Sequence, residues 1–337
     1  MLGVPTVSVV IVNWNGGEYI GRCLEALARQ TLPPDEVVVV DNASSDDSAV
    51  MVDERYPWAL LVRNTHNAGF GAGCNLGVRA TSSDFVATLN PDTQPDPRWL
   101  ETLVGVARQS DARVGMWASL MNFMEPFDLI NSAGIAIDVL GIAWDRLGGQ
   151  PALPAPAPVE VFGPCAGAAL YRRTLLEELG GFDEEYFLYL EDVDLAWRAQ
   201  AAGWRCRFVP ESLVYHAHSA AAVEGSPLKY RLLGRSKIRL IAKNYPWPQV
   251  ALWGPLILAY DALAVGLACS RGDFASLRGR LEGLAGLAGA VASRAAAGAG
   301  RPEAWANARR TMLGVESPWA IRRRFAHLAG RRAQPGL

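Results

Sequence analysis

Four short apolar segments in the first half of the chain are each followed by asparagine or aspartate side chains. The segments are residues 8–12, 37–40, 60–63 and 85–89, and the polar residues behind them are Asn13, Asn15, Asp41, Asn42, Asn64, Asn67, Asn90 and Asp92. Ligands of open parallel sheets bind at the carboxyl ends of strands, so we expect these amides and carboxylates to line a binding site. The alternative is that they only cap helices and form turns, which accounts well for residues 44–47.

The Asn90-Pro91-Asp92 sequence has the chemistry of a weak metal site. One carboxylate beside a second oxygen donor suits Mg²⁺ or Mn²⁺ that takes its other ligands from a substrate diphosphate and water. A plain turn is the alternative, because Asn-Pro is a turn former. His216 follows a later strand-like segment and could add a neutral imidazole to the metal, while His218 lies on the same face by the two-residue period of a strand.

Three carboxylates, those of Glu191, Asp192 and Asp194, crowd the start of a helix expected over residues 191–202. Helix N-termini stabilise negative charge, so simple capping is the alternative to a functional role. Asp194 and Arg198 are four residues apart and are expected to pair. Asp192 is then left as a free carboxylate at the mouth of an apolar pocket, where it could act as a general base.

The glycines Gly69, Gly71 and Gly73 do not form a dinucleotide-binding fingerprint. A G-x-G-x-x-G motif that began at Gly69 or Gly71 would need a third glycine where Cys74 or Leu76 stands. This excludes the usual dehydrogenase pattern. The glycines instead predict a tight loop against a ligand or a neighbouring backbone.

The elements that must position these residues alternate between strands and helices. Helices are expected near residues 18–30, 44–56, 72–80 and 98–109, between the four apolar segments and a fifth strand at 114–118. This order predicts an α/β fold with a mostly parallel central sheet flanked by helices. Residues 121–161 are less regular, and the chain after residue 230 is mostly helical. We therefore expect a catalytic region at residues 1–230 and a helical C-terminal region at 231–337.

Charge divides the chain unevenly, although the net charge is only −2. Residues 271–337 hold 12 arginines and 4 acidic residues, a net +8, whereas residues 1–270 hold 20 basic and 30 acidic residues, a net −10. The basic tail suggests an anionic partner such as a membrane surface, or else a solvated helical face. The longest apolar stretch, residues 250–269, is interrupted by Pro255 and Asp261. It predicts a helix buried in the protein or at a bilayer interface rather than one that spans a membrane.

The five cysteines are odd in number and include no CxxC pair, so reduced thiols in a cytosolic protein are expected. The N-terminal apolar run is too short for a signal peptide, and no nucleic-acid partner is expected.

Several of these fragments together resemble glycosyltransferase family 2, and especially its bacterial rhamnosyltransferase-like branch. The matching fragments are Val-Ile-Val-Asn-Trp-Asn-Gly at 10–16, Val-Asp-Asn-Ala-Ser-Ser-Asp at 40–46, Asn-Ala-Gly-Phe-Gly-Ala-Gly-Cys-Asn at 67–75, Leu-Asn-Pro-Asp at 89–92, Gly-Pro-Cys-Ala-Gly-Ala-Ala-Leu at 163–170 and Glu-Asp-Val-Asp-Leu at 191–195. They extend over residues 7–219 and agree with the family in order and spacing. The resemblance implies the GT-A fold for residues 1–230.

The resemblance also implies roles for individual residues. Asp92 matches the last acid of the DXD motif and would hold the metal, with His216 as the distal ligand, whereas Asn90 replaces the motif's first acid. Asp192 matches the catalytic base of the ED motif, and residues 163–167 would form the acceptor-side loop. Asp41 would bind the pyrimidine base. The residues expected to contact the nucleotide sugar are Val12, Asn13, Asn15, Asp41, Asn67, Asn75, Asn90 and Glu191.

The implied activity is an inverting transfer of a sugar from a nucleotide diphosphate to a hydroxyl, assisted by Mg²⁺ or Mn²⁺. The branch favours L-rhamnose from dTDP-L-rhamnose, and UDP-linked galactose, glucose or galactofuranose come next. The acceptor would be a cell-surface glycan or its lipid-linked precursor, at the inner face of the cell membrane. A nucleotidyltransferase of related fold is the rival class, but residues 13–17 lack its Gly-rich triphosphate loop with a Lys or Arg. A non-catalytic sugar-binding scaffold and a processive synthase are further alternatives.

Overall fold

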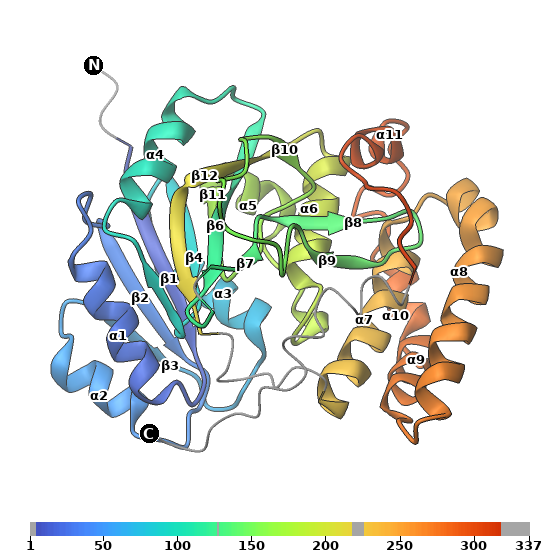
Figure 1. The fold of residues 1–337 in the computed structure, drawn as a ribbon, viewed down its shortest axis with the longest axis horizontal. Coiled ribbons are helices and arrows are strands. Elements are labelled where there is room, and N and C mark those ends of the chain that lie inside the picture. The colour runs from blue at the N-terminus through green and yellow to red at the C-terminus, as the bar shows by residue number, and fades with distance from the viewer. Residues whose placement is uncertain (1–4, 127, 218–225, 318–337) are drawn as a thin grey trace.

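A ten-stranded mixed sheet forms the centre of the protein (Figure 1). The computed structural model describes residues 5–126, 128–217 and 226–317. The strands lie in the order β10 (Glu160–Val161), β12 (Arg205–His216), β6 (Val114–Phe123), β11 (Ala168–Arg172), β4 (Phe85–Leu89), β1 (Val7–Asn13), β2 (Glu36–Asp41) and β3 (Leu60–Arg63). Two short strands extend it, since β5 (Thr93–Pro95) pairs with β12 and β7 (Ile130–Ser132) pairs with β6. A separate hairpin consists of β8 (Ile135–Ile137) and β9 (Ala143–Asp145).

The four strands expected in the first half of the chain are present as β1, β2, β3 and β4, and they run parallel to one another. Their registers bring the polar ends together, because Asn13 pairs with Asp41 and Asp41 pairs with Arg63. The expected α/β class is therefore confirmed. Asn13 and Asp41 are expected at the carboxyl ends of these strands. In the structure they lie there, side by side at the ends of β1 and β2.

The other half of the sheet is mixed because β11 runs antiparallel to both of its neighbours. This strand is not expected from the sequence, since a short apolar run does not reveal its direction or its partners. The strand-like segment before His216 belongs to one long strand, β12, whose register shifts between Val209 and Leu213. The strand expected at 114–118 continues to Phe123. Because β6 and β12 are both longer than expected, they pair as far as Phe123 and His216 and place His216 at the end of the sheet.

Helices cover both faces of the sheet. Successive side chains of β1 point to opposite faces and all of them are buried, so each face must be covered. Val9 and Ile11 belong to a buried cluster with side chains of α1 (Gly17–Ala28) and α4 (Trp99–Gln109). Val10 and Val12 belong to the cluster on the other face, with α3 (Phe70–Arg79) and α6 (Glu191–Ala201). The remaining elements of this part are α2 (Ser48–Arg55), α5 (Arg173–Leu179) and the short 3₁₀ helix η1 (Glu184–Tyr186).

The C-terminal part of the described chain is helical. It contains α7 (Pro227–Asn244), α8 (Trp247–Cys269), α9 (Ala275–Ala285), α10 (Leu287–Ala292) and α11 (Ala304–Arg309). Helix α7 runs through the expected boundary at residues 230 and 231, and that division of the chain stays a prediction. Of the described helices, only α8 is long and apolar enough to cross a membrane. Only 6% of its most apolar window is buried, so the expectation of a helix buried in the protein is wrong.

Candidate functional site

The ends of β1 and β2 are joined by hydrogen bonds between their polar side chains. The Asn13 amide nitrogen donates to Asp41 Oδ1 at 3.1 Å and to the hydroxyls of Ser44 and Ser48 at 3.2 and 2.9 Å. The Asn13 Oδ1 atom is buried without a hydrogen-bond partner in the described structure. Asn15 adopts a positive φ of 52° and its Oδ1 accepts from the Ser45 N–H at 2.7 Å. These bonds hold the two loops in one arrangement beside the strand ends.

A second set of hydrogen bonds fixes the glycine-rich loop. The Asn42 amide donates to the Gly69 carbonyl at 2.9 Å, and the Gly69 N–H donates to Asn67 Oδ1 at 2.9 Å. Gly69 has a φ of 90°, and a Cβ there would lie 2.3 Å from the Phe187 carbonyl oxygen. The prediction of a tight loop against a neighbouring backbone is therefore confirmed for Gly69, whereas it is wrong for Gly71 and Gly73, which lie in helix α3. Glycine is required at residue 69 because no side chain fits between these two backbones.

Asn75 connects α3 to the segment that precedes α6. Its amide nitrogen donates to the Phe182 carbonyl and to Glu184 Oε1, both at 2.9 Å, while its oxygen accepts from the Phe182 N–H at 2.8 Å. Both polar groups of this side chain are thus bonded to protein. A contact between Asn75 and a nucleotide sugar stays a prediction, as do those of Val12 and Asn67.

The loop before α6 has a strained backbone. Phe187, Tyr189 and Leu190 all have positive φ, at 63°, 67° and 67°. Side chains other than glycine avoid this region, and each such residue costs about 1–3 kcal/mol, so the surrounding structure must hold them there. The Phe70 N–H donates to the Phe187 carbonyl at 2.7 Å, which ties this loop to α3. The last of these residues, Leu190, is the N-cap of α6, so this loop leads directly into the helix that carries Asp192.

Asp92 and His216 lie together although 124 residues separate them in the sequence. The short strand β5 pairs Thr93 with His216, and this brings His216 Nε2 to 3.0 Å from Asp92 Oδ1. The other ring nitrogen, Nδ1, lies 2.8 Å from Asn131 Oδ1. Burial alone would lower the pKa of His216, but the charge and hydrogen bond of Asp92 outweigh it and raise that pKa above its usual value. His218, the other predicted candidate, lies outside the described residues.

Asp192 is partly exposed at the start of α6 and accepts two backbone hydrogen bonds. The Ala166 N–H donates to its Oδ2 at 3.2 Å and the Val193 N–H to its Oδ1 at 2.8 Å. Burial raises the pKa of the Asp192 carboxyl to about 6, against the hydrogen bond from Ala166, and the charge of Asp145 adds to the increase. A carboxylate with this pKa is mostly ionised at neutral pH and is still basic enough to accept a proton.

Glu191 is buried next to Asp192 and behaves differently. Burial raises the pKa of Glu191 well above its usual value, and the neighbouring Asp192 charge raises it further. Its Oε2 atom is buried without a hydrogen-bond partner in the described structure. Burial and the charge of Asp192 therefore both favour the protonated form of Glu191. A neutral carboxyl can donate a hydrogen bond, which fits its predicted place in the nucleotide-sugar site.

A short segment, residues 165–167, lies between Asp192 and the Asn90-Pro91-Asp92 turn. Its Ala166 N–H contacts Asp192, while its Gly167 carbonyl accepts from the Asn90 N–H at 2.9 Å. A Cβ on Gly167 would lie 3.0 Å from the side-chain nitrogen Nδ2 of Asn90, so the Asn90 side chain packs closely against Gly167. Asp145 at the end of β9 raises the pKa of both Asp192 and His216. The structure thus brings Asp192, Asn90 and the Asp92–His216 pair into one region.

Replacing Asp145 by asparagine should make Asp192 more acidic. Removing a nearby negative charge lowers the pKa of a carboxylate, by up to about one unit. If Asp192 must be ionised for activity, wild-type kcat/KM falls as the pH drops below about 6, and in Asp145→Asn this fall should move to lower pH. The measurement is the pH profile of kcat/KM, with Asp111→Asn as the control at an exposed acid. If kcat/KM fell at the same pH in Asp145→Asn as in the wild type, the ionisation of Asp192 would not be the cause of that fall.

Helix α7 holds the start of α6 through a buried charge network. Lys243 lies 2.6 Å from Asp183 and 2.9 Å from Asp194, and Asp194 also pairs with Arg198 at 2.8 Å. The expected pair of Asp194 and Arg198 is thus confirmed. Burial opposes ionisation of Asp194, but Arg198 and Lys243 outweigh it and lower its pKa to about 2. Lys243 is absent from the predicted site, and it anchors the helix that carries Asp192.

Lys243→Met should destabilise the protein strongly, because two buried carboxylates would lose their shared cation. Breaking a buried pair by removing one partner costs about 3–5 kcal/mol in the free energy of unfolding. The pKa of Asp194 is lowered in the folded state, so its ionisation stabilises the protein above about pH 4, and this is lost as the pH falls towards 2. Urea unfolding at neutral pH measures the change. Arg22→Met, which removes an exposed pair with Glu18, is the control and should cost less than about 1 kcal/mol. An equal, small effect of both changes would contradict the anchoring role.

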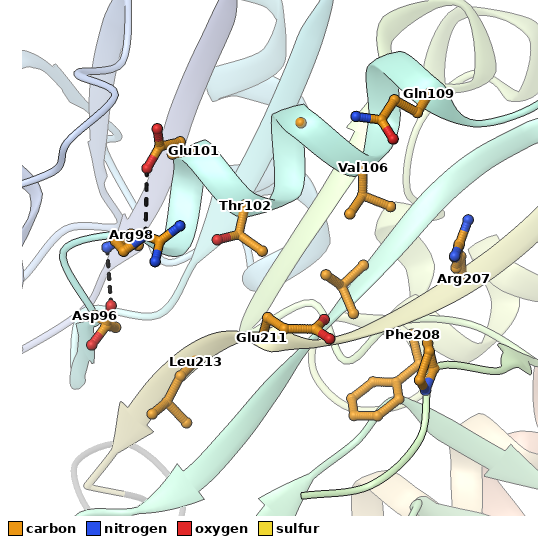
Figure 2. A pocket seen from close by; sticks show the side chains of 13 residues that line it. Asp96, Arg98, Glu101, Thr102, Val106, Gln109, Arg207, Phe208, Glu211 and Leu213 are labelled. Carbon is orange, nitrogen blue, oxygen red and sulfur yellow. Dashed lines mark hydrogen bonds and ion pairs between the residues drawn. The ribbon is translucent and has the colours of Figure 1, made fainter.

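A surface pocket of about 700 Å³ lies elsewhere, between α4 and β12 (Figure 2). Figure 2 shows that Arg98 and Glu101 on its rim point toward each other, with their charged atoms 3.6 Å apart. None of the predicted site residues lines this pocket. The pocket contains none of the residues assigned to the metal, the nucleotide or the general base, so we do not place the chemistry there.

Three residues of this region are not predicted from the sequence, namely Asn131, Asp145 and Lys243. Asn131 and Asp145 belong to the stretch 121–161, where no helix or strand period is visible. Their contacts with His216 and Asp192 depend on β7 and β9, which the sequence does not predict. The sequence does single out Lys243 to some extent. Only three lysines occur in the chain and all of them lie in α7.

Comparison with known proteins identifies the family of the chain. The family described as glycosyl transferase family 2 matches residues 8–180, and glycosyl transferase family group 2 matches residues 158–267. The N-acetylglucosaminyl-diphospho-decaprenol L-rhamnosyltransferase of Mycobacterium tuberculosis is 32% identical over 249 residues, which are 65% of this chain and 79% of that protein. The pre-mycofactocin glycosyltransferase of the same organism is 33% identical over 221 residues, 63% of this chain and 43% of that protein.

Solved structures share the fold at low sequence identity. GalNAc-T7 with UDP, GalNAc and Mn²⁺ matches with a TM-score of 0.58 and 18% identity, covering 72% of this chain and 49% of that one. The mannosyltransferase PcManGT from Pyrobaculum calidifontis, in complex with GDP-Man and Mn²⁺, matches with a TM-score of 0.53 and 20% identity, covering 90% of this chain and 88% of that one. The fold is therefore that of the GT-A glycosyltransferases.

With this fold and these sequence matches, the protein is a sugar-transferring enzyme. The chain belongs to glycosyl transferase family 2, and it is similar to the rhamnosyltransferase-like branch of that family.

Proposed function

We propose that the enzyme transfers L-rhamnose from dTDP-L-rhamnose, with inversion at the anomeric carbon, to a hydroxyl of a lipid-linked glycan acceptor. The sugar and the acceptor class follow the name of the mycobacterial rhamnosyltransferase to which the chain is similar, and dTDP is the nucleotide expected from the resemblance to that branch. One observation carries the mechanism: a carboxylate with a pKa of about 6, Asp192, shares one region with the Asp92–His216 pair. The assigned residues therefore have the separate chemical tasks that an inverting transfer needs.

The nucleotide would bind at the ends of β1 and β2. Asp41 is held beside Asn13, and the unpartnered Asn13 Oδ1 atom faces the same loops. A buried oxygen without a partner costs stability unless a ligand or water satisfies it, which supports a donor N–H of the base at this place. Asn15 and the loop at Ser44 would then enclose the nucleoside. The neutral carboxyl of Glu191 would donate a hydrogen bond to the donor sugar.

A divalent cation fits the residues that surround Asp92. Asn131 accepts a hydrogen bond from His216 Nδ1–H, and this orients Nε2 as the nitrogen that can bind a metal. Asp92 supplies a carboxylate oxygen beside it. No group of three or more His, Cys, Asp and Glu suited to a metal occurs among the described residues, so the diphosphate and water would supply the other ligands. When bound, the cation would offset the negative charge that develops on the departing diphosphate.

Asp192 would act on the acceptor. It takes the proton of the acceptor hydroxyl while that oxygen attacks the anomeric carbon, and the bond from this carbon to the diphosphate oxygen breaks in the same step. The pair of bonding electrons leaves with dTDP, so one displacement inverts the anomeric centre. The N–H of Ala166 holds the carboxylate in place for this transfer. The 163–167 loop would face the acceptor, since it lies against both α6 and Asn90.

A lipid-linked acceptor implies that the enzyme works at a membrane. We propose a cytoplasmic protein that associates peripherally with the inner face of the cell membrane through its C-terminal region. The net +8 charge of residues 271–337 supports this, because the cytoplasmic leaflet is anionic.

A thermal-shift screen of nucleotide sugars with and without Mn²⁺ tests the proposed donor. A ligand that binds only the folded protein stabilises it, by about 2.7 kcal/mol at a hundred times its dissociation constant. We expect dTDP-L-rhamnose with Mn²⁺ to give the largest rise in melting temperature. A larger rise with a UDP-sugar would replace the donor assignment, and no rise with any nucleotide sugar would refute the proposed site.

A further inference from the structure

Helix α8 is apolar on all sides, yet one side of it is not covered by protein. Its inner face packs against the core through Val250, Trp253, Ile257 and Tyr260, which recur every three or four residues. Its outer face carries Leu252, Leu256, Leu258 and Leu263, which are 65%, 47%, 72% and 46% exposed. A helix that is hydrophobic all round is normally buried in a protein core or in a membrane. The outer face of α8 therefore lacks its partner within the described structure.

The neighbouring helix α9 extends this apolar surface. Leu277, Leu281 and Leu284 follow the helical period and are 37%, 58% and 55% exposed, and Phe274 just before α9 is 61% exposed. Figure 1 shows α8 and α9 at the margin of the molecule opposite α1 and α2. Exposed apolar patches of this kind mark interaction sites rather than ordinary surface. We call these residues of α8 and α9 the leucine surface.

The single charged side chain of α8 is turned away from this surface. Asp261 lies 2.8 Å from Lys237 of α7 and 2.9 Å from Arg280 of α9, and all three side chains are less than 20% exposed. An unpaired aspartate would strongly oppose insertion into hydrocarbon. Its charge is instead compensated inside the protein, so that α8 presents no formal charge outwards. The charge of Asp261, which interrupts the apolar stretch in the sequence, therefore does not oppose contact between the outer face of α8 and a membrane.

We propose that the leucine surface docks the enzyme on a phospholipid bilayer, with α8 lying in the interface. The exposed positions of α8 between residues 251 and 266 are Ala, Leu, Pro and Gly, and none offers a side-chain hydrogen bond. Protein interfaces contain about one hydrogen bond per 100–200 Å², so this face fits hydrocarbon better than a protein partner. Trp247, 57% exposed at one end of α8, has the amphipathic ring that favours the headgroup level.

Charge fixes the direction of docking. The described segment that follows α8, residues 271–317, holds seven arginines and four acidic residues and is attracted to an anionic leaflet, whereas residues 1–270, with a net charge of −10, are repelled by it. The leucine surface should therefore face the bilayer while the sheet faces the cytoplasm. This deepens the proposed function and rests on it for the presence of a membrane near the acceptor.

Vesicle flotation of the full-length protein tests the proposal. The protein should float with vesicles of phosphatidylcholine and phosphatidylglycerol, and more weakly with phosphatidylcholine alone. The double variant Leu252→Glu/Leu258→Glu should bind the mixed vesicles about tenfold or more weakly, because two inserted leucines become charged. Leu153→Glu, at an 82% exposed leucine in a loop, is the matched control and should float like the wild type. Leu281→Glu on α9 gives an independent test of the same surface.

Thermal stabilisation by dTDP with Mn²⁺ separates this inference from the proposed function. The double variant should keep the wild-type stabilisation, which also shows that it is folded. Stabilisation without flotation of the wild type, or equal flotation of the double variant, would overturn the docking surface. The docking surface would also be overturned if the wild type were a dimer and the double variant a monomer, because a second copy of the chain would then cover the leucines. Flotation without stabilisation would refute the nucleotide site and leave the docking surface supported.

Discussion

Replacing Asp192 by asparagine is expected to lower kcat by about 10²- to 10⁴-fold, the usual contribution of a general base. The amide keeps the shape of the side chain and can still contact the Ala166 N–H, but it cannot take the acceptor proton. The affinity for dTDP-L-rhamnose with Mn²⁺ should change little, because the donor contacts assigned above do not include Asp192. Steady-state transfer rates and titration of the donor measure the two quantities separately.

The neighbour Glu191 provides the control for this prediction. Glu191→Gln keeps the shape of the side chain and its ability to donate a hydrogen bond, as does the protonated form of Glu191 that burial favours. It should therefore retain far more activity than Asp192→Asn. If Asp192→Asn transferred the sugar at close to the wild-type rate, Asp192 would not be the base. If Glu191→Gln were as inactive as Asp192→Asn, the two carboxyls could not have the separate tasks assigned to them.

Removing the carboxylate of Asp92 should have the second large effect. Metal assistance contributes several kcal/mol to the transition state, and each 1.36 kcal/mol corresponds to a factor of ten in rate. We expect Asp92→Ala to lower kcat/KM by about 10²- to 10³-fold and to abolish the dependence on Mn²⁺. His216→Ala should follow the same direction with a smaller loss, since Asp92 would still bind the metal. Activity measured across a series of Mn²⁺ concentrations tests both variants.

Asp192→Asn is the matched control for the metal prediction, because it should lose activity and still respond to Mn²⁺ in donor binding. An Asp92→Ala enzyme that keeps its activity and its response to Mn²⁺ would place the cation elsewhere. Equal activity of the wild type with chelator and with Mn²⁺ would remove the metal from the proposed mechanism.

The parts of the fold that follow from local pattern could be predicted from the sequence. Short apolar runs identify β1, β2, β3 and β4, and the four-residue spacing of Asp194 and Arg198 predicts their pair. The close approach at Gly69 is similar, because glycines in a loop indicate that a backbone or a ligand is near. In each case a few neighbouring residues determine the result.

The features of the fold and the site that the sequence did not predict depend on contacts between distant segments. The direction of β11 is set by its two neighbours in the sheet, and β5 becomes visible only through its pairing with β12. Asn131, Asp145 and Lys243 reach the site from segments 85, 47 and 49 residues away from His216, Asp192 and Asp194. Apolar composition likewise did not show that one face of α8 is exposed. The roles of the predicted site residues remain predictions that the variants above test.

Electron paramagnetic resonance of Mn²⁺ in the presence of dTDP tests the central claim most directly. The account predicts one bound Mn²⁺ per protein in the wild type and in Asp192→Asn, strongly weakened binding in Asp92→Ala, and a smaller but measurable weakening in His216→Ala. Such a result would place the cation on the Asp92–His216 pair and keep it separate from the base. Wild-type binding of Mn²⁺ by the Asp92→Ala and His216→Ala proteins, or no binding by the wild type with dTDP, would contradict the account.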